Sequence, residues 1–210
     1  KLKINYIDSE DLQKDTPKNL LSDCDGILVP GGFGNRGFEG KISAIKYARE
    51  KNIPFFGICL GLQMAVIEYA RNVCDLKNAN SRESGRKIKD FVIDIMEDQK
   101  NLDSKGGNMR LGDYPCEIKK STKVAEAYRK TKILERHRHR YEVNPKYHNI
   151  LSKKGLILSG LSPDGKLAET IEIKEHPWFV ACQFHPEFKS KPFQPHPLFL
   201  NFIKASSKKS

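Results

Sequence analysis

Between residues 26 and 71 the apolar positions form two repeats of a short run followed by a longer periodic segment. Residues 26–30 and 53–58 are mostly apolar and are punctuated by glycine or proline, as short buried strands are. In residues 39–51 and 60–71 the apolar side chains recur every three or four positions, as on one face of a helix. This order predicts an α/β fold, doubly wound, with a mostly parallel central sheet flanked by helices.

Weaker patterns extend the prediction to the rest of the chain. Residues 2–7 alternate between apolar and polar positions, which predicts a half-buried strand. Residues 156–173 predict an added β-hairpin, because its turn, Ser162-Pro-Asp-Gly165, has a proline that presets φ and a glycine that allows positive φ. The other expected strands are 89–96, 133–143 and 178–184, the other expected helices are 122–130, 146–153 and 198–204, and residues 101–112 are expected to form a loop.

Composition indicates one folded domain. The chain has 210 residues, of which 38% are hydrophobic and 30% charged, enough to bury a core. We expect the domain at residues 1–205 and a basic tail at residues 206–210. No apolar run approaches the roughly 18 residues that span a bilayer, and no signal segment opens the chain, so no membrane association is expected.

Charge and cysteine content narrow the class of protein. The formal net charge is +11, but the lysines are scattered and no RNP, zinc-finger or helix-turn-helix pattern accompanies them. A solvated lysine-rich surface is therefore favoured over nucleic-acid binding. The five cysteines are an odd number without a C-x-x-C pair, which favours a reducing cytoplasm over a disulfide framework or a zinc site.

One cysteine stands where a nucleophile is expected. Cys59 lies between a predicted strand and a predicted helix, with Gly57 and Gly61 two positions away on either side. That spacing is typical of a nucleophile elbow, a crowded turn in which a Cβ would clash. At a helix N-terminus the thiolate is favoured, so we expect a thiol pKa lowered from about 8.5 toward roughly 3.5–7.5. The remaining cysteines are expected to be structural: Cys24, Cys74, Cys116 and Cys182.

A thiol nucleophile also needs a base and an oxyanion hole. His185 and Glu187 follow the last predicted strand, at the strand end where α/β folds place their sites. His185 could take the thiol proton, and Glu187 could orient the imidazole. Backbone N–H groups of the loop at residues 30–34, together with that of Leu60, could hold the oxyanion.

The same loop also matches a dinucleotide-binding pattern. Gly32, Gly34 and Gly37 have the G-x-G-x-x-G spacing after a predicted strand. The next strand, however, does not end in an acidic residue for a ribose, and the pattern leaves Cys59 and His185 unexplained. A phosphate loop of the Walker A type fails because Phe38 follows Gly37 where a lysine is required.

Together these motifs resemble those of class I glutamine amidotransferases with a Cys-His-Glu triad. Residues 78–81, 106–112 and 135–144 narrow the resemblance to the glutaminase domain of the CTP synthase family, over nearly the whole chain. The resemblance implies that the domain hydrolyses L-glutamine, with Gly32 and Leu60 as the oxyanion donors.

The resemblance further implies that Gln63, Glu83 and Arg140 bind the substrate. A glutamate suits the α-ammonium of glutamine, and an arginine suits its α-carboxylate through paired hydrogen bonds. His137 and His139 could be taken for a metal pair, but no third ligand is evident and the family implies no metal in this domain.

The resemblance places the rest of the reaction outside this chain. In the family an N-terminal synthase domain uses ATP and Mg to aminate UTP to CTP with the ammonia, GTP stimulates the glutaminase half, and the full-length enzyme is a homotetramer. The chain departs from the pattern in lacking the family's first strand and helix, in having Asn108 where threonine is expected, and in a short basic stretch at residues 84–87. These departures bear on the GTP response and on domain contacts rather than on the triad.

Two alternatives stay open at this point. One is another class I amidotransferase or a γ-glutamyl hydrolase, against which the segments at 106–112 and 135–144 argue. The other is a non-catalytic dinucleotide-binding or regulatory module on the same fold, which an intact triad disfavours.

Overall fold

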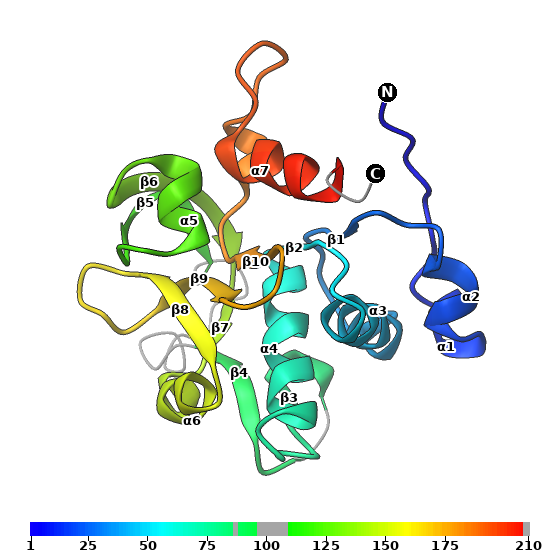
Figure 1. Ribbon diagram of the computed structural model, residues 1–210. Coiled ribbons are helices and arrows are strands. Elements are labelled where there is room, and N and C mark those ends of the chain that lie inside the picture. The colour runs from blue at the N-terminus through cyan, green and yellow to red at the C-terminus, as the bar shows by residue number, and fades with distance from the viewer. Residues whose placement is uncertain (86–87, 96–108, 208–210) are drawn as a thin grey trace.

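A computed structural model describes residues 1–85, 88–95 and 109–207 of the chain. Its main feature is a seven-stranded sheet in the order β1-β2-β10-β9-β8-β5-β6 (Figure 1). The strands are β1 (Ile27–Val29), β2 (Phe55–Ile58), β5 (Arg110–Ile118), β6 (Lys132–His139), β8 (Leu156–Leu161), β9 (Ala168–Ile173) and β10 (Phe179–Cys182). A second sheet has the order β3-β4-β7, formed by β3 (Asn80–Ser81), β4 (Phe91–Ile95) and β7 (Tyr141–Val143).

The α/β prediction is confirmed, but the sheet is mixed rather than mostly parallel. Only β1, β2 and β10 pair in parallel within the seven-stranded sheet, and its other described neighbours are antiparallel. The reason lies in the connections. Parallel neighbours need a long crossover, whereas β8 and β9 are joined by a hairpin turn, as predicted, and β9 and β10 by residues 174–178 alone.

Helices cover both faces of the sheet. Phe55 and Phe56 are adjacent in β2 and both fully buried, but they point into two different cores because side chains alternate along a strand. The core on the Phe55 side is closed by α3 (Phe38–Glu50) and α4 (Leu60–Asn72), and the core on the Phe56 side by α5 (Lys123–Tyr128) and α7 (Pro197–Ser206). Helix α4 contacts strands of both sheets, and its residues from Leu60 to Ala70 are all buried.

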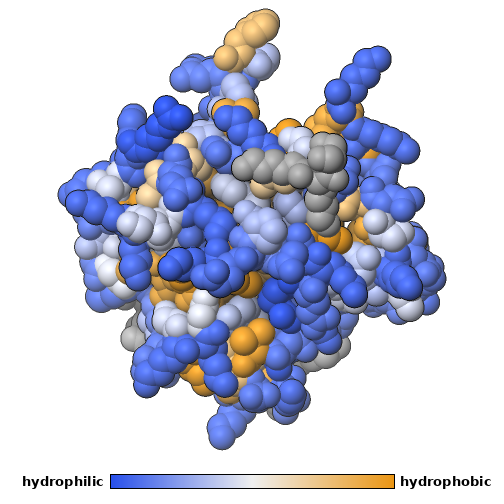
Figure 2. Space-filling model, in the orientation of Figure 1, coloured by the Kyte–Doolittle hydropathy of each residue, from blue (hydrophilic) through white to orange (hydrophobic). Residues whose placement is uncertain are grey.

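Short helices complete the described structure. They are α1 (Asp11–Lys14), α2 (Pro17–Leu21) and α6 (His148–Lys153), with the 3-10 turns η1 (Arg82–Ser84), η3 (Pro145–Tyr147) and η4 (Pro186–Phe188). Hydrophilic residues cover most of the face shown in Figure 2. Within the described ranges, no helix combines the length and the apolarity that crossing a bilayer requires.

Three sequence-based expectations need correction. Residues 2–7 are not a strand: no described strand pairs with this segment, and Leu2, Ile4 and Tyr6 are 65%, 61% and 91% exposed. The extended segment 133–143 is divided at Arg140, with β6 in the large sheet and β7 in the small one.

The third correction concerns the predicted loop at residues 101–112. Residues 101–108, including Asn108, lie outside the described part of the chain, but residues 110–112 belong to the long strand β5. Gly112 and Pro115, both unusual in strands, hide this strand from pattern analysis. At the C-terminus α7 extends to Ser206, the first residue of the predicted tail, and residues 86–87 and 208–210 are outside the described part.

Candidate active site

Cys59 occupies a strained turn between β2 and α4. Its φ of 50° and ψ of −100° lie in a region that non-glycine residues rarely adopt. The turn is held because the Cys59 N–H donates to the carbonyl of Cys182 in the neighbouring strand at 2.7 Å. The Cys59 carbonyl also accepts the first helical hydrogen bond of α4, from Gln63 N at 3.2 Å. Strain of this kind at a non-glycine residue is typical of functional sites.

The two elbow glycines are required by close packing, as predicted. A Cβ on Gly61 would lie 2.2 Å from the carbonyl oxygen of Val29 in β1. A Cβ on Gly57 would lie 2.8 Å from the main chain of Gly61 and 2.9 Å from the Cβ of Ala181. The elbow is therefore wedged between β1 and β10, and it cannot relax without moving the sheet.

Replacing Gly61 with alanine is expected to lower the free energy of unfolding by about 3 kcal/mol, because the new methyl group overlaps main-chain atoms that cannot give way. Urea unfolding monitored by circular dichroism measures the loss. Gly165→Ala is the matched control: Gly165 has a φ of 73° with nothing within 4 Å, so only the left-handed backbone is penalised there, by about 1 kcal/mol. Equal losses in the two variants would contradict the packing argument.

The thiol does not have the lowered pKa that its helix position predicts. Burial raises the pKa of Cys59 to about 12, opposed by a hydrogen bond from the Leu60 N–H and increased further by the charges of Glu142, Glu187 and Glu83. The side chain is 3% exposed, so loss of hydration outweighs the helix terminus. Cys59 is therefore a neutral thiol at neutral pH unless a base accepts its proton.

His185 is placed to be that base. Its Nδ1 is 2.6 Å from Oε1 of Glu187 in η4, while its Nε2 is buried and has no partner among the described residues. A Cβ built on Gly31 would lie 2.8 Å from Cε1 of His185 and 3.6 Å from Cβ of Cys59, so the imidazole and the thiol meet above this glycine. Phe188 stacks on the imidazole with ring centroids 5.1 Å apart. The histidine thus has one nitrogen fixed by a carboxylate and one without a described partner, in a ring that lies near the Cys59 side chain.

The loop after β1 lines the same place. A Cβ on Gly32 would lie 3.2 Å from the Leu60 side chain, so the two expected oxyanion donors are neighbours. Gly34 N–H donates to Oε1 of Glu83 at 2.7 Å. This contact argues against the dinucleotide interpretation, since a phosphate at Gly34 would be next to a carboxylate.

The expected substrate residues lie on different elements. Gln63 is buried on α4, and its Nε2 donates to the Tyr141 carbonyl at 3.0 Å. Glu83 is half-buried in η1, and burial raises its pKa against the Gly34 hydrogen bond and the charge of Arg140. Arg140 is exposed at the break between β6 and β7. These three residues therefore come from separate parts of the chain, and the Glu83 hydrogen bond ties one of them to the loop after β1.

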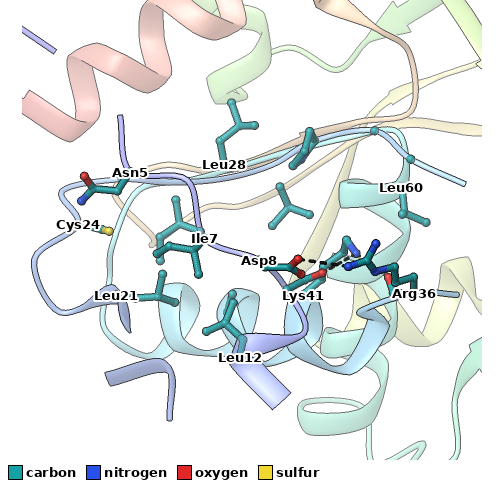
Figure 3. A pocket seen from close by; sticks show the side chains of 18 of the residues that line it. Asn5, Ile7, Asp8, Leu12, Leu21, Cys24, Leu28, Arg36, Lys41 and Leu60 are labelled. Atoms are coloured by element: carbon teal, nitrogen blue, oxygen red, sulfur yellow. Dashed lines mark hydrogen bonds and ion pairs between the residues drawn. The ribbon is translucent and has the colours of Figure 1, made fainter. Parts of the chain in front are cut away.

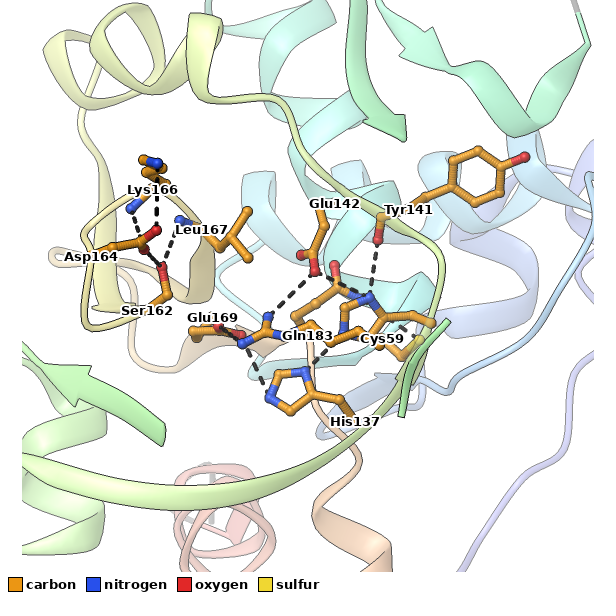
Figure 4. Close-up of polar contacts among 12 residues, drawn as sticks. Cys59, His137, Tyr141, Glu142, Ser162, Asp164, Lys166, Leu167, Glu169 and Gln183 are labelled. Atoms are coloured by element: carbon orange, nitrogen blue, oxygen red, sulfur yellow. Dashed lines mark hydrogen bonds and ion pairs between the residues drawn. The ribbon is translucent and has the colours of Figure 1, made fainter. Parts of the chain in front are cut away.

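A buried ionic cluster behind the thiol was not predicted from the sequence (Figure 4). Arg110 of β5 contacts Oε1 of Glu142 at 3.3 Å and Oε1 of Glu169 at 2.6 Å, and all three side chains are at most 8% exposed. His137 and His139, the pair that suggested a metal, join this cluster: His137 Nδ1 is 2.8 Å from His139 Nε2. The residues described in the structure include no group of three or more His, Cys, Asp or Glu side chains that could hold a metal ion.

The two histidines should make stability pH-dependent. Burial and the charge of Arg110 lower the pKa of His137 and His139 to about 2 and about 3, so below pH 6.5 the unfolded chain takes up protons that the folded chain does not. Stability is then present above about pH 6.5 and lost as the pH falls, by up to about 1.4 kcal/mol per pH unit for each histidine. Urea unfolding at several pH values between 5 and 7 gives the free energy of unfolding, which should change less steeply with pH for His137→Gln than for the original protein. An unchanged slope would contradict this assignment.

A separate cavity of about 500 Å³ lies next to the loop after β1 (Figure 3). Its lining runs from Asn5 and Ile7 of the N-terminal segment to Gly32 and Leu60. It includes neither Cys59 nor His185, so it is distinct from the place where the thiol and the imidazole meet.

Comparison with known proteins gives a consistent result. Residues 1–205 match the family described as glutamine amidotransferase class-I. The chain is 59% identical over 203 residues to the CTP synthase of Clostridium acetobutylicum, covering 97% of this chain and 38% of that protein. It is 53% identical over 212 residues to the CTP synthase of Bdellovibrio bacteriovorus, covering 100% of this chain and 40% of that protein.

A solved structure is also similar. The Trypanosoma brucei CTPS glutaminase domain with bound acivicin superposes with a TM-score of 0.92 at 43% sequence identity, covering 100% of this chain and 82% of that one. The chain thus spans about two fifths of the curated relatives given above and most of this solved domain.

Proposed function

Because the chain belongs to the class I glutamine amidotransferases, in the group of CTP synthase glutaminase domains, we propose that it hydrolyses L-glutamine through a Cys59 thioester. The observation that supports this most directly is the state of His185. One ring nitrogen is held by Glu187 at 2.6 Å, and the other is buried without a partner among the described residues, while the imidazole and the Cys59 side chain both lie close to Gly31. A thiol with a pKa raised to about 12 needs such a base.

The reaction then runs in two steps, formation of the Cys59 thioester with release of ammonia and hydrolysis of that thioester by water. His185 Nε2 takes the thiol proton, and the sulfur attacks the side-chain carbonyl of glutamine to form a tetrahedral oxyanion. Backbone N–H groups of Gly32 and Leu60 stabilise that oxyanion. The C–N bond breaks, and ammonia leaves with the proton from His185. Water, deprotonated by the same nitrogen, hydrolyses the thioester to glutamate and restores the thiol.

We assign substrate binding to Gln63, Glu83 and Arg140. Glu83 suits the α-ammonium and Arg140 the α-carboxylate, and the charge of Arg140 acts on Glu83 by lowering its pKa. Glu83 also accepts a hydrogen bond from the Gly34 N–H. Substrate binding at Glu83 would therefore be linked to the position of the loop at residues 30–34, which includes the oxyanion donor Gly32.

The fate of the ammonia is a broader proposal. The relatives named CTP synthase are more than twice as long as this chain. We propose that a synthase domain uses the ammonia to convert UTP to CTP with ATP and Mg, that GTP acts as activator, and that the full-length enzyme is a cytoplasmic homotetramer. No cofactor is assigned to the described domain itself.

The deciding experiment is covalent labelling with a diazo-ketone analogue of glutamine, read by intact mass and peptide mapping. We expect a single adduct on Cys59 that excess glutamine suppresses. Adducts spread over several cysteines, or no adduct even in the presence of the synthase domain, would contradict the proposal.

A further inference from the structure

A second carboxamide contacts the proposed nucleophile and has no role in the mechanism above. Gln183 directly follows β10 and is fully buried. Its Nε2 lies 3.7 Å from Sγ of Cys59, within hydrogen-bond range for sulfur (Figure 4). Its main-chain N–H donates to the Glu169 carbonyl at 2.8 Å, so the backbone on which the side chain stands is fixed.

The orientation of this carboxamide follows from its neighbours. The Tyr141 carbonyl can only accept, so Gln63 must present its NH₂ group to it, at 3.0 Å. The same NH₂ group lies 3.4 Å from Oε1 of Gln183 and donates its second hydrogen there. Gln183 must therefore turn its own NH₂ group toward the sulfur. A main-chain carbonyl of β7 thus determines which end of Gln183 the nucleophile meets.

The environment of the sulfur makes such a donor valuable. Burial and three carboxylates disfavour a negative charge on Cys59, and the donors that oppose them are the Leu60 main-chain N–H and the Gln183 carboxamide. Hydrogen bonds to an ionised acceptor are stronger than those between neutral groups. The Gln183 donor therefore gains strength when the thiol loses its proton.

We propose that Gln183 is a further catalytic residue, which donates an N–H to the Cys59 sulfur and stabilises the attacking thiolate, in an orientation fixed by Gln63 and the Tyr141 carbonyl. This inference rests on the proposed function of Cys59 as nucleophile. It also gives Gln63 a second role. Besides binding the substrate glutamine, Gln63 orients the Gln183 side chain that donates to the Cys59 sulfur, and it does so before any substrate is present.

The test measures the thiolate without glutamine. The rate of Cys59 alkylation by iodoacetamide is followed by peptide mapping from pH 6 to 10, in Gln183→Leu, in Gln183→Glu and in the original protein. Gln183→Leu removes the donor, so the plot of alkylation rate against pH should shift to higher pH by about one unit. On the rising part of the plot this is about tenfold slower labelling at a given pH. Gln183→Glu keeps the size and the acceptor for Gln63 but places an anion at the sulfur, so its shift should be larger.

Glutamine kinetics add a second readout. Both variants should lower kcat by about tenfold or more with little change in KM, because the donor touches the sulfur and not the bound amino acid. Gln13→Leu, which removes an exposed carboxamide of α1, is the matched control and should change neither the curve nor kcat.

The outcomes separate the two proposals. If the diazo-ketone analogue does not label Cys59 selectively in the original protein, the proposed function fails. If labelling is selective but both Gln183 variants alkylate along the original pH curve, only the role of Gln183 is overturned. Should Gln183→Leu fail to fold, as thermal melting would show, the Gln183→Glu curve alone decides.

Discussion

Replacing Cys59 with alanine is expected to lower the rate of glutamine hydrolysis by at least about 10⁴-fold, since covalent catalysis needs the sulfur and no described residue can replace it. The other buried cysteines are not expected to substitute, because Cys116 and Cys182 lie within strands and Cys74 follows α4, so none stands at the turn between β2 and α4; burial raises their pKa as well. Ammonia release measured with a coupled assay gives the rate, and the diazo-ketone analogue should no longer add to the protein.

The control for this variant is Cys24→Ala. Cys24 is half-buried and lines the separate cavity, whose lining includes neither Cys59 nor His185, so hydrolysis should stay within about twofold of the original. Residual hydrolysis above 1% of the original in Cys59→Ala, with the protein shown pure by mass, would contradict the assignment of the nucleophile.

Replacing His185 with asparagine is expected to lower hydrolysis by about 10⁴-fold at pH 8. The size follows from the thiol itself: with its pKa near 12, only about one Cys59 in 10⁴ is ionised at pH 8 without a base. The remaining activity should therefore rise about tenfold for each pH unit between pH 7 and 10, because the thiolate fraction does. The original protein should show no such steep rise.

A matched control is His148→Asn on α6, a half-buried histidine outside the site, which should keep the original rate and pH profile. A flat pH profile in His185→Asn would mean that the thiol is ionised without the imidazole. In that case the high pKa given by burial would be wrong and the base would have to be sought elsewhere.

The elbow and the triad could be predicted from the sequence because their constraints are local. Gly57 and Gly61 flank Cys59 within five residues, so the spacing can be seen in the sequence, although the contacts that forbid a Cβ also involve Val29 of β1 and Ala181 of β10. The chemistry of the thiol could not be predicted in the same way. Its pKa depends on burial and on Glu142, Glu187 and Glu83, which come from three other places in the chain.

Strand pairing explains the other limits. The pattern of residues 2–7 indicates which side chains would share a face but not whether a partner strand exists. The ionic cluster of Arg110, Glu142 and Glu169 joins β5, β7 and β9, and no pattern within one strand indicates that these charges meet. Gln183 stands two residues before His185, so the sequence places it near the predicted base. Its contact with Cys59, however, joins residues 124 positions apart and cannot be predicted from either motif.

The division of residues 133–143 at Arg140 has a mechanical meaning for the bound amino acid. Arg140 stands where the chain passes from the large sheet to the small one, and Glu83 follows β3 of the small sheet, while Cys59 follows β2 and His185 follows β10 of the large sheet. A glutamine bound as proposed would therefore contact both sheets. A relative shift of the two sheets would change how its α-ammonium and α-carboxylate are held, without changing the position of Cys59 in the large sheet.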